Sequence, residues 1–293
     1  MGLEMTVTHY YHSGFSVACD DIILIFDYWL GEENELRDSE QITAAELEKY
    51  NEIYVFISHE HIDHLDPVVY TWRDQVPVMY IVSSDMPVGT RGKRMAPGEF
   101  ARLSENVSVR AFDSTDLGVS FLVDIKGIRV FHAGDLNFWH WRDESTAADI
   151  AEAEEEYTKV LHTLEGQDID VCMFPVDPRQ GGMYDAGANY FILTVKPRLM
   201  IPMHYFHRGD IAMEFARRAR CRTTEVLAMP GYGDRIRLSF HEDGDTEIRY
   251  VSVHPQDGEE EVTQSDEFPI ESGNDPFAES DMPVPLSRDN DHE

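Results

Sequence analysis

The segment from residue 53 to residue 64 constrains the fold more than any other part of this sequence. Ile53 to Ile57 is an unbroken apolar run bounded by polar residues, which predicts a strand buried on both faces. Such a strand requires a sheet that is covered on both sides. The run leads directly into a segment with three histidines and one aspartate, His59 to His64, called the histidine loop below. The chain therefore places polar side chains at the end of a buried strand, where active sites commonly lie.

The rest of the domain alternates between strand-like and helix-like segments. Strands are expected at residues 6–11, 15–18, 22–26, 78–82, 107–112, 119–124, 129–132, 171–176, 199–203, 226–229 and 235–240. Helices are expected at residues 149–165, 188–195 and 211–219, and Asp66-Pro67 marks a further helix start. Strands come first, and strands and helices then alternate. We therefore expect an α+β fold, a four-layer αββα sandwich of two sheets with helices outside.

Composition divides the chain into one domain and one tail. Residues 1–253 carry all of the expected strands and helices, and a single sandwich domain can reach this size. Residues 254–293 are rich in Asp, Glu, Pro, Ser and Gly and hold few large apolar side chains. Such a segment buries too little apolar surface to offset its ordering entropy. We expect an acidic disordered tail that serves solubility, with partner binding as the alternative.

Charge and composition also narrow the function and the location. The net charge of −32 repels phosphate backbones, so we expect a small-molecule substrate and disfavour nucleic acid. No stretch of about twenty apolar residues predicts a membrane span, and the first residues lack the features of a signal peptide. The three cysteines are widely spaced and predict no disulfide framework. We expect a cytoplasmic protein without membrane contact, and the sequence leaves its oligomeric state open.

The spacing within the histidine loop suits metal ions. His59 and His61 are two residues apart, so in extended backbone their imidazoles point the same way and can reach one ion. Asp63 and His64 follow where the chain begins to turn, so they can face a second ion. Two ions about 3.5–4 Å apart can clamp a displacement reaction. Imidazole suits zinc, iron, manganese or nickel, and added carboxylates favour harder ions.

The string HEHIDH of the histidine loop matches the HxHxDH motif of the metallo-β-lactamase superfamily, which this chain resembles. The resemblance implies that His59 and His61 bind one ion and that Asp63 and His64 bind the other. Within the superfamily the chain resembles the branch of L-ascorbate-6-phosphate lactonase-like proteins and uncharacterised zinc-dependent hydrolases.

Three further motifs extend this resemblance over nearly the whole domain. Asp27, in the string IFD, resembles an aspartate that supports the metal loop and holds a ligand's orientation. Asp135, in the string HAGD, resembles an aspartate that bridges both ions. His204, in the string IPMH, resembles a histidine ligand of the second ion. The resemblance therefore implies a binuclear site.

One element of the superfamily pattern is missing. The superfamily usually supplies another histidine between the HxHxDH and HAGD motifs, yet this chain has none from Leu65 to Phe131. The corresponding loop, residues 112–118, offers Asp116 or Asp113 as an oxygen ligand, and position favours Asp116. The alternatives are a water in that place or a weakly bound first ion. An oxygen ligand favours Mn²⁺ or Fe²⁺, so we expect two divalent ions, either zinc or manganese or iron.

Five more residues near these loops are candidates for contacting substrate or orienting a ligand. They are His12, Asn137, His140, Asp177 and Arg179. His12 lies in the string YHSGF, which resembles a turn of the same branch whose histidine lies near the metals. Asp177 and Arg179 follow an expected strand and either bind a substrate carboxylate or phosphate or pair with each other.

The sequence thus predicts a metallo-hydrolase. Two divalent ions and a bridging hydroxide would cleave a small ester, lactone or phosphodiester, with Asp63 orienting the hydroxide and carrying a proton. One alternative is a phosphodiesterase or nuclease of the same fold, which the acidic surface disfavours. The other is a non-enzymatic binding protein with a degenerate metal site, which the missing histidine keeps open.

Overall fold

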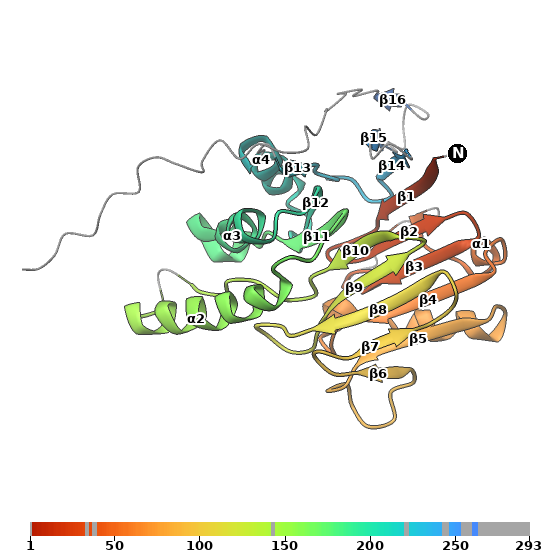
Figure 1. Ribbon diagram of the computed structural model, residues 1–293, viewed down its shortest axis with the longest axis horizontal. Coiled ribbons are helices and arrows are strands. Elements are labelled where there is room, and N and C mark those ends of the chain that lie inside the picture. Colours follow the sequence, from red (N-terminus) through yellow and green to blue (C-terminus); the bar gives the residue numbers. More distant parts are fainter. Residues whose placement is uncertain are drawn as a thin grey trace, which may run out of the picture.

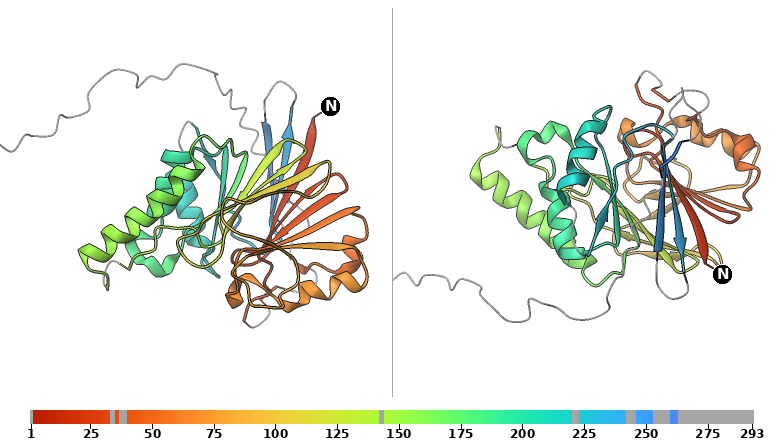
Figure 2. Two further views of the ribbon diagram at one scale, coloured as in Figure 1. Left: turned by 60° about the horizontal axis from the view of Figure 1, so that its bottom comes forward. Right: turned by 90° about the horizontal axis from the view of Figure 1, so that it is seen from above.

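Two sheets pack face to face with helices on their outer sides (Figure 1, Figure 2). The computed structural model describes residues 2–32, 35–36, 40–141, 144–219, 223–241, 246–252 and 260–262. Helices α2 (Ala147–Leu164), α3 (Ala186–Val195) and α4 (Gly209–Ala219) lie outside the second sheet, and α1 (Ala44–Leu47) lies at the first. The expected α+β sandwich of two sheets and helices is therefore confirmed.

The first sheet has nine strands among the described residues, in the order β16-β15-β14-β1-β2-β3-β4-β5-β6. The pairs from β3 to β6 are parallel, and the other pairs are antiparallel. The strands are β1 (Leu3–His9), β2 (Phe15–Cys19), β3 (Ile22–Phe26), β4 (Glu52–Ile57), β5 (Val78–Ser83), β6 (Lys93–Met95), β14 (Arg235–Phe240), β15 (Thr246–Ser252) and β16 (Glu260–Val262).

The second sheet has seven strands among the described residues, in the order β13-β12-β11-β10-β9-β8-β7. The pairs from β10 to β13 are parallel, and those from β7 to β10 are antiparallel. The strands are β7 (Phe100–Arg102), β8 (Val107–Phe112), β9 (Ser120–Ile125), β10 (Ile128–His132), β11 (Val171–Pro175), β12 (Leu199–Met203) and β13 (Glu225–Val226).

Alternate residues of β3 and β4 enter two different hydrophobic cores, as a strand buried on both faces requires. Leu24 and Phe56 belong to the core between the sheets. Ile25 and Val55 belong to a second core on the outer face of the first sheet, which Trp72 closes. The prediction that Ile53 to Ile57 form a strand covered on both sides is confirmed.

Several expected elements differ in length. Asp66 caps a turn that begins at Pro67. This turn is a short 3₁₀ helix, η3 (Pro67–Tyr70), and it does not continue as an α-helix. The strand expected at residues 226–229 ends at Val226. None of the described helices combines the length and apolar character needed to cross a membrane. Within the expected tail, β16 pairs with β15, so the sheet extends past residue 253. The other tail residues lie outside the described part of the chain.

Candidate metal centre

The carboxyl ends of parallel strands from both sheets meet in one place. In the first sheet, β3 leads into Asp27 and β4 leads into the histidine loop. In the second sheet, the segments that follow β10, β11 and β12 carry Asp135, Asp177 and His204. Open α/β sheets bind ligands outside the carboxyl ends of their strands. The expected site residues, far apart in sequence, are therefore neighbours in space.

Asp135 lies at the centre of this cluster, and both of its carboxylate oxygens face imidazoles. Its Oδ1 lies 3.0 Å from Nε2 of His64 and 3.2 Å from Nε2 of His204. Its Oδ2 lies 3.3 Å from Nε2 of His59 and 3.9 Å from Nδ1 of His61. The two oxygens of one carboxylate thus face two separate pairs of imidazoles, as a ligand shared by two cations does.

The donor atoms fit metal ions because several of them are buried without a hydrogen-bond partner among the described residues. These atoms are Nε2 of His64, Nε2 of His204, Oδ1 of Asp135 and both ring nitrogens of His12. Each buried polar group left unpaired costs about 1–3 kcal/mol, so such atoms are rare unless an ion or a water satisfies them. Imidazole and carboxylate together suit divalent transition metals.

The candidate ligands fall into three overlapping groups, and within each group all ligand atoms lie within 4.8 Å of one another. Asp135 is shared by two of the groups and His64 by two. The groups are His59, His64 and Asp135; His61, Asp116 and Asp135; and His12, Asp63, His64 and His204. These overlapping groups are the candidate metal ligands of the described residues.

Asp116, and not Asp113, lies beside the exposed imidazole of the cluster. It joins the group of His61 and Asp135 and comes from the loop between β8 and β9. The carboxylate of Asp113 instead accepts a hydrogen bond from the backbone of Ser114 at 3.1 Å. Asp116 therefore lies at an open edge of the cluster, where 44% of the His61 side chain is exposed.

Asp27 holds the histidine loop through Ser58. Its Oδ1 accepts from the backbone N–H of Ser58 at 2.8 Å, and its Oδ2 accepts from the Ser58 hydroxyl at 2.5 Å. Oδ2 also lies 2.8 Å from Nδ1 of His64. The Ser58 hydroxyl lies 2.9 Å from Nδ1 of His59. Asp27 and Ser58 thus orient both imidazoles so that each Nε2 faces Asp135. Sequence reasoning missed Ser58, although its place directly before the histidine loop is a usable signal.

Asp177 supports His204 in the same way. Its Oδ2 lies 2.9 Å from Nδ1 of His204, and its side chain is fully buried. Arg179 donates from Nε to both oxygens of Asp177, at 3.0 and 2.9 Å, and its guanidinium lies over the ring of Phe206. Asp177 therefore faces protein groups, while the half-exposed Arg179 lies at the edge of the cluster.

Asn137 and His140 lie outside the ligand groups. The Asn137 amide donates to Gln180 at 3.0 Å and accepts from the backbone of Phe138 at 2.9 Å. Nδ1 of His140 lies 3.3 Å from the carbonyl of Phe138, and the two rings stack at 4.3 Å. Asn137 therefore joins two segments near the cluster, whereas His140 contacts its own segment.

Gly118 is a second residue that sequence reasoning missed. It has a φ of +84°, and an added Cβ would lie 2.0 Å from the carbonyl oxygen of Ser58 and 2.6 Å from Cβ of His59. The N–H of Val119 donates to that same carbonyl at 3.1 Å. Only glycine lets the loop between β8 and β9 pass this close to the histidine loop.

Opposite charges shift the pKa values within the cluster. Burial favours the neutral form of Asp135, but the imidazoles of His64, His204 and His59 outweigh it and hold the carboxyl pKa well below its usual range. Burial likewise disfavours the charged form of His64, but Asp135 and Asp27 raise its pKa well above the usual value. For His12, burial and then the neighbouring His204 lower the pKa to about 3, so this imidazole is neutral, the form that binds metals.

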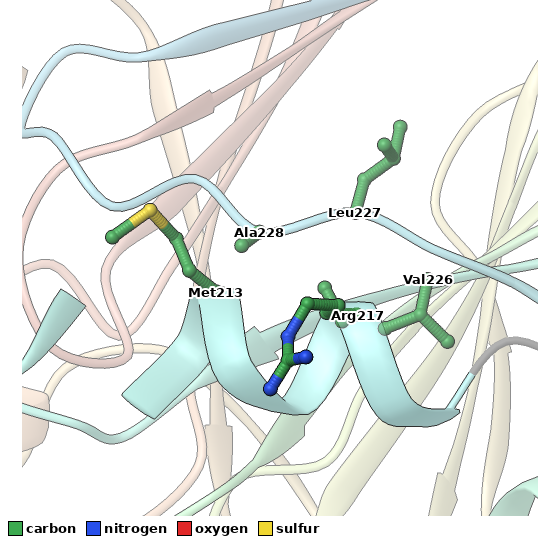
Figure 3. Close-up of a pocket in the computed structure, with 6 residues that line it drawn as sticks. Met213, Arg217, Val226, Leu227 and Ala228 are labelled. Atoms are coloured by element: carbon green, nitrogen blue, oxygen red, sulfur yellow. The ribbon is translucent and has the colours of Figure 1, made fainter. Parts of the chain in front are cut away.

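A separate open pocket lies between α4 and the segment that includes β13 (Figure 3). Its lining is aliphatic apart from one arginine: Met213, Ala216, Arg217, Val226, Leu227 and Ala228. These residues include none of the candidate ligands and no side chain that serves as a nucleophile or general base. The cluster around Asp135 is therefore the candidate functional site.

Comparison with known proteins agrees with this geometry. No family model matches the chain. A curated relative, the UPF0173 metal-dependent hydrolase of Archaeoglobus fulgidus, is 26% identical over 222 residues, which cover 69% of this chain and 83% of that protein. Igni18, described as a novel metallo hydrolase from the archaeon Ignicoccus hospitalis, has 19% identity and a TM-score of 0.60, covering 81% of this chain and all of that one.

A third similar structure identifies the fold. The metallo-β-lactamase fold protein YhfI from Bacillus subtilis superposes with a TM-score of 0.52 at 13% identity, covering 80% of this chain and 99% of that chain. This chain has the metallo-β-lactamase fold. The resemblance expected from the string HEHIDH is thereby confirmed, and the named relatives agree with the metallo-hydrolase predicted from the sequence.

Proposed function

We propose that this metallo-β-lactamase-fold protein uses two divalent cations to hydrolyse a small ester, lactone or phosphodiester. The position of Asp135 between two pairs of imidazoles is the observation that carries the proposal. Divalent cations in such a site polarise a carbonyl or phosphoryl oxygen and lower the pKa of water towards ~7.

In this proposal the ligands divide into an open set (His59, His61 and Asp116) and a buried set (Asp63, His64 and His204). His59, His61 and Asp116 hold the first cation, and Asp135 is shared. Asp63, His64 and His204 hold the second. The oxygen ligand Asp116 supports manganese or iron beside zinc as the resident ions, since harder cations prefer oxygen donors.

The side chains around the open set favour a small substrate with an apolar part. Ile62 lies within the histidine loop, Leu117 follows Asp116, and Trp141 follows six residues after Asp135; all three are exposed. Exposed apolar side chains that cluster at a site often contact a ligand. Nη1 of Arg179 makes no hydrogen bond to any described residue, so it is available to an anionic group on the substrate.

Asp63 is the proposed proton carrier. It lies in η2 (Ile62–His64) at the edge of the buried set, partly exposed, with Oδ2 3.4 Å from Nε2 of His12. Partial burial favours its neutral form, but His12, His64 and His204 lower its pKa, so the carboxylate is charged at neutral pH and can accept a proton.

Metal analysis combined with a substrate panel tests this function. We expect the purified protein to bind two equivalents of zinc, manganese or iron and to hydrolyse at least one class among lactones, phosphodiesters and carboxylic esters. Asp135→Asn should lose more than about a hundredfold in metal affinity, because changes to groups that only orient ligands already cost 10–100-fold. The matched control is the exposed carboxylate Asp168→Asn. Absence of tightly bound metal in the wild type would reject the proposal and favour a degenerate binding protein.

A further inference from the structure

His12 occupies an unusual position for a histidine without a defined role. It lies in the turn between β1 and β2, where the N–H of Tyr10 donates to the carbonyl of Gly14 and the N–H of Gly14 donates to the carbonyl of Tyr11. Its φ is +56°, a left-handed conformation that costs a branched or bulky side chain roughly 1–2 kcal/mol and that glycine or asparagine adopts more easily. Strain of this kind persists where surrounding structure imposes it, and it concentrates at functional sites.

The strained turn sends the imidazole into the cluster. The side chain is fully buried, and neither ring nitrogen has a hydrogen-bond partner among the described residues. Its ring lies 3.9 Å from the ring of His204, and the backbone N–H of His204 donates to the carbonyl of His12 at 3.1 Å. A buried neutral imidazole normally pairs at least one nitrogen, so these two orphaned atoms need an explanation.

We infer that His12 is a further side-chain ligand of the second cation, beside Asp63, His64, His204 and the shared Asp135. The ligand atoms of His12, Asp63, His64 and His204 all lie within 4.8 Å of one another. Donors about 2.0–2.2 Å from a four- or five-coordinate ion lie roughly 2.9–3.6 Å apart. Nε2 of His12 lies 3.4 Å from Oδ2 of Asp63, which is the separation expected of two ligands on one ion.

With His12, Asp63, His64, His204 and the shared Asp135, protein side chains fill the second site. Sites in which side chains fill the coordination sphere hold their metal as structure, whereas catalytic sites keep a position open for water or substrate. The buried set would then retain its ion, and the exposed His61 and Asp116 would mark the exchangeable ion next to the substrate. This inference rests on the proposed binuclear function and assigns unequal affinities to its two ions.

Zinc titration of the metal-depleted full chain against a chromophoric chelator tests the assignment. The wild type should bind one equivalent more tightly than the other. His12→Phe keeps an aromatic ring against Phe206, whose ring lies 4.1 Å from that of His12, but removes both nitrogens. It should weaken the tighter equivalent at least tenfold, since loss of a ligand costs no less than loss of a group that orients one.

His140→Phe is the matched control, because it also replaces a buried histidine that stacks on a phenylalanine, outside the ligand groups. It should leave both affinities unchanged. Equal zinc binding by wild type and His12→Phe would overturn the role of His12 while leaving the binuclear function intact. A wild type that binds no zinc would reject both.

A direct measurement covers the case in which His12→Phe does not fold. Anomalous diffraction from wild-type crystals grown with zinc locates the second ion without any substitution. A ring nitrogen of His12 at about 2.1 Å from the ion supports the assignment. A His12 ring whose nitrogens both lie beyond about 3 Å from that ion overturns it.

Discussion

Oδ2 of Asp177 lies 2.9 Å from Nδ1 of His204, so the carboxylate fixes the tautomer whose Nε2 faces Asp135. Asp177→Asn keeps the shape of the side chain but removes the charge and one acceptor. We expect metal affinity at the buried set to fall by about 10–100-fold, the usual cost of losing such a partner. Chelator competition measures the loss. The exposed Asp210→Asn serves as the control, and unchanged affinity in Asp177→Asn would show that His204 needs no support.

Gly118→Ala should disrupt the histidine loop. The new methyl group would overlap the carbonyl of Ser58, so the loop must shift and metal binding by His59 should weaken. Gly127→Ala is a matched control, because Gly127 has a φ of +89° and nothing within 4 Å of an added Cβ. The left-handed backbone should cost each variant about 1–2 kcal/mol in urea unfolding, and Gly118→Ala should lose more because of the overlap. Only Gly118→Ala should also lose metal, and equal metal binding by the two would refute the clash.

Asp116→Ala should remove the weaker bound ion, because this side chain supplies the oxygen beside His61 and Asp135. Elemental analysis after dialysis should then find one equivalent of metal in place of two. Asp113→Ala, in the same loop but hydrogen-bonded to Ser114, should keep both. If Asp116→Ala retains two equivalents, water completes the first site.

His9 is one of the buried imidazoles that should make the protein less stable as the pH falls. Burial lowers the pKa of this imidazole to about 4, and nearby Asp234 only partly offsets the effect. Between pH 6.5 and about 4, His9 binds a proton in the unfolded chain but not in the folded chain. Lowering the pH through this range should therefore reduce the free energy of unfolding by up to about 3 kcal/mol through His9. Urea unfolding of wild type and His9→Asn at pH 7 and pH 5 measures this. The variant should depend less on pH, whereas the exposed His162→Asn should match the wild type.

Much of the site followed from the sequence because its residues stand next to strong strand signals. The bounds expected for β3, β8, β12 and β14 agree with the structure, since turn residues flank compact apolar runs. Asp135 and His204 follow parallel strands of one sheet, so they were bound to approach each other. Their approach to the histidine loop, which belongs to the other sheet, depends on how the two sheets pack. Asp116 was chosen over Asp113 by position, and the structure brings it to the cluster.

The contacts that orient the site did not follow from the sequence. Ser58 acts through a hydrogen bond to Asp27, which lies 31 positions away. Gly118 acts through a close backbone approach, which no sequence motif records. The short strands β6 and β7 have three residues each, too few to show a periodic pattern. Asp177 was predicted as a possible substrate contact, but its burial against His204 depends on how β11 and β12 pair.

The double burial of β3 has a consequence for how the chain finds its register. In a half-buried strand, slipping by one residue exposes apolar side chains, and that penalty selects the correct alignment. Leu24 and Ile25 enter two different cores. A slip of one residue in β3 would again place apolar side chains in both cores, so it would expose little apolar surface. The polar group at the strand's end must break this ambiguity. The hydrogen bonds between Asp27 and Ser58 join the ends of β3 and β4, so Asp27 helps to set the register of β3 as well as supporting the histidine loop.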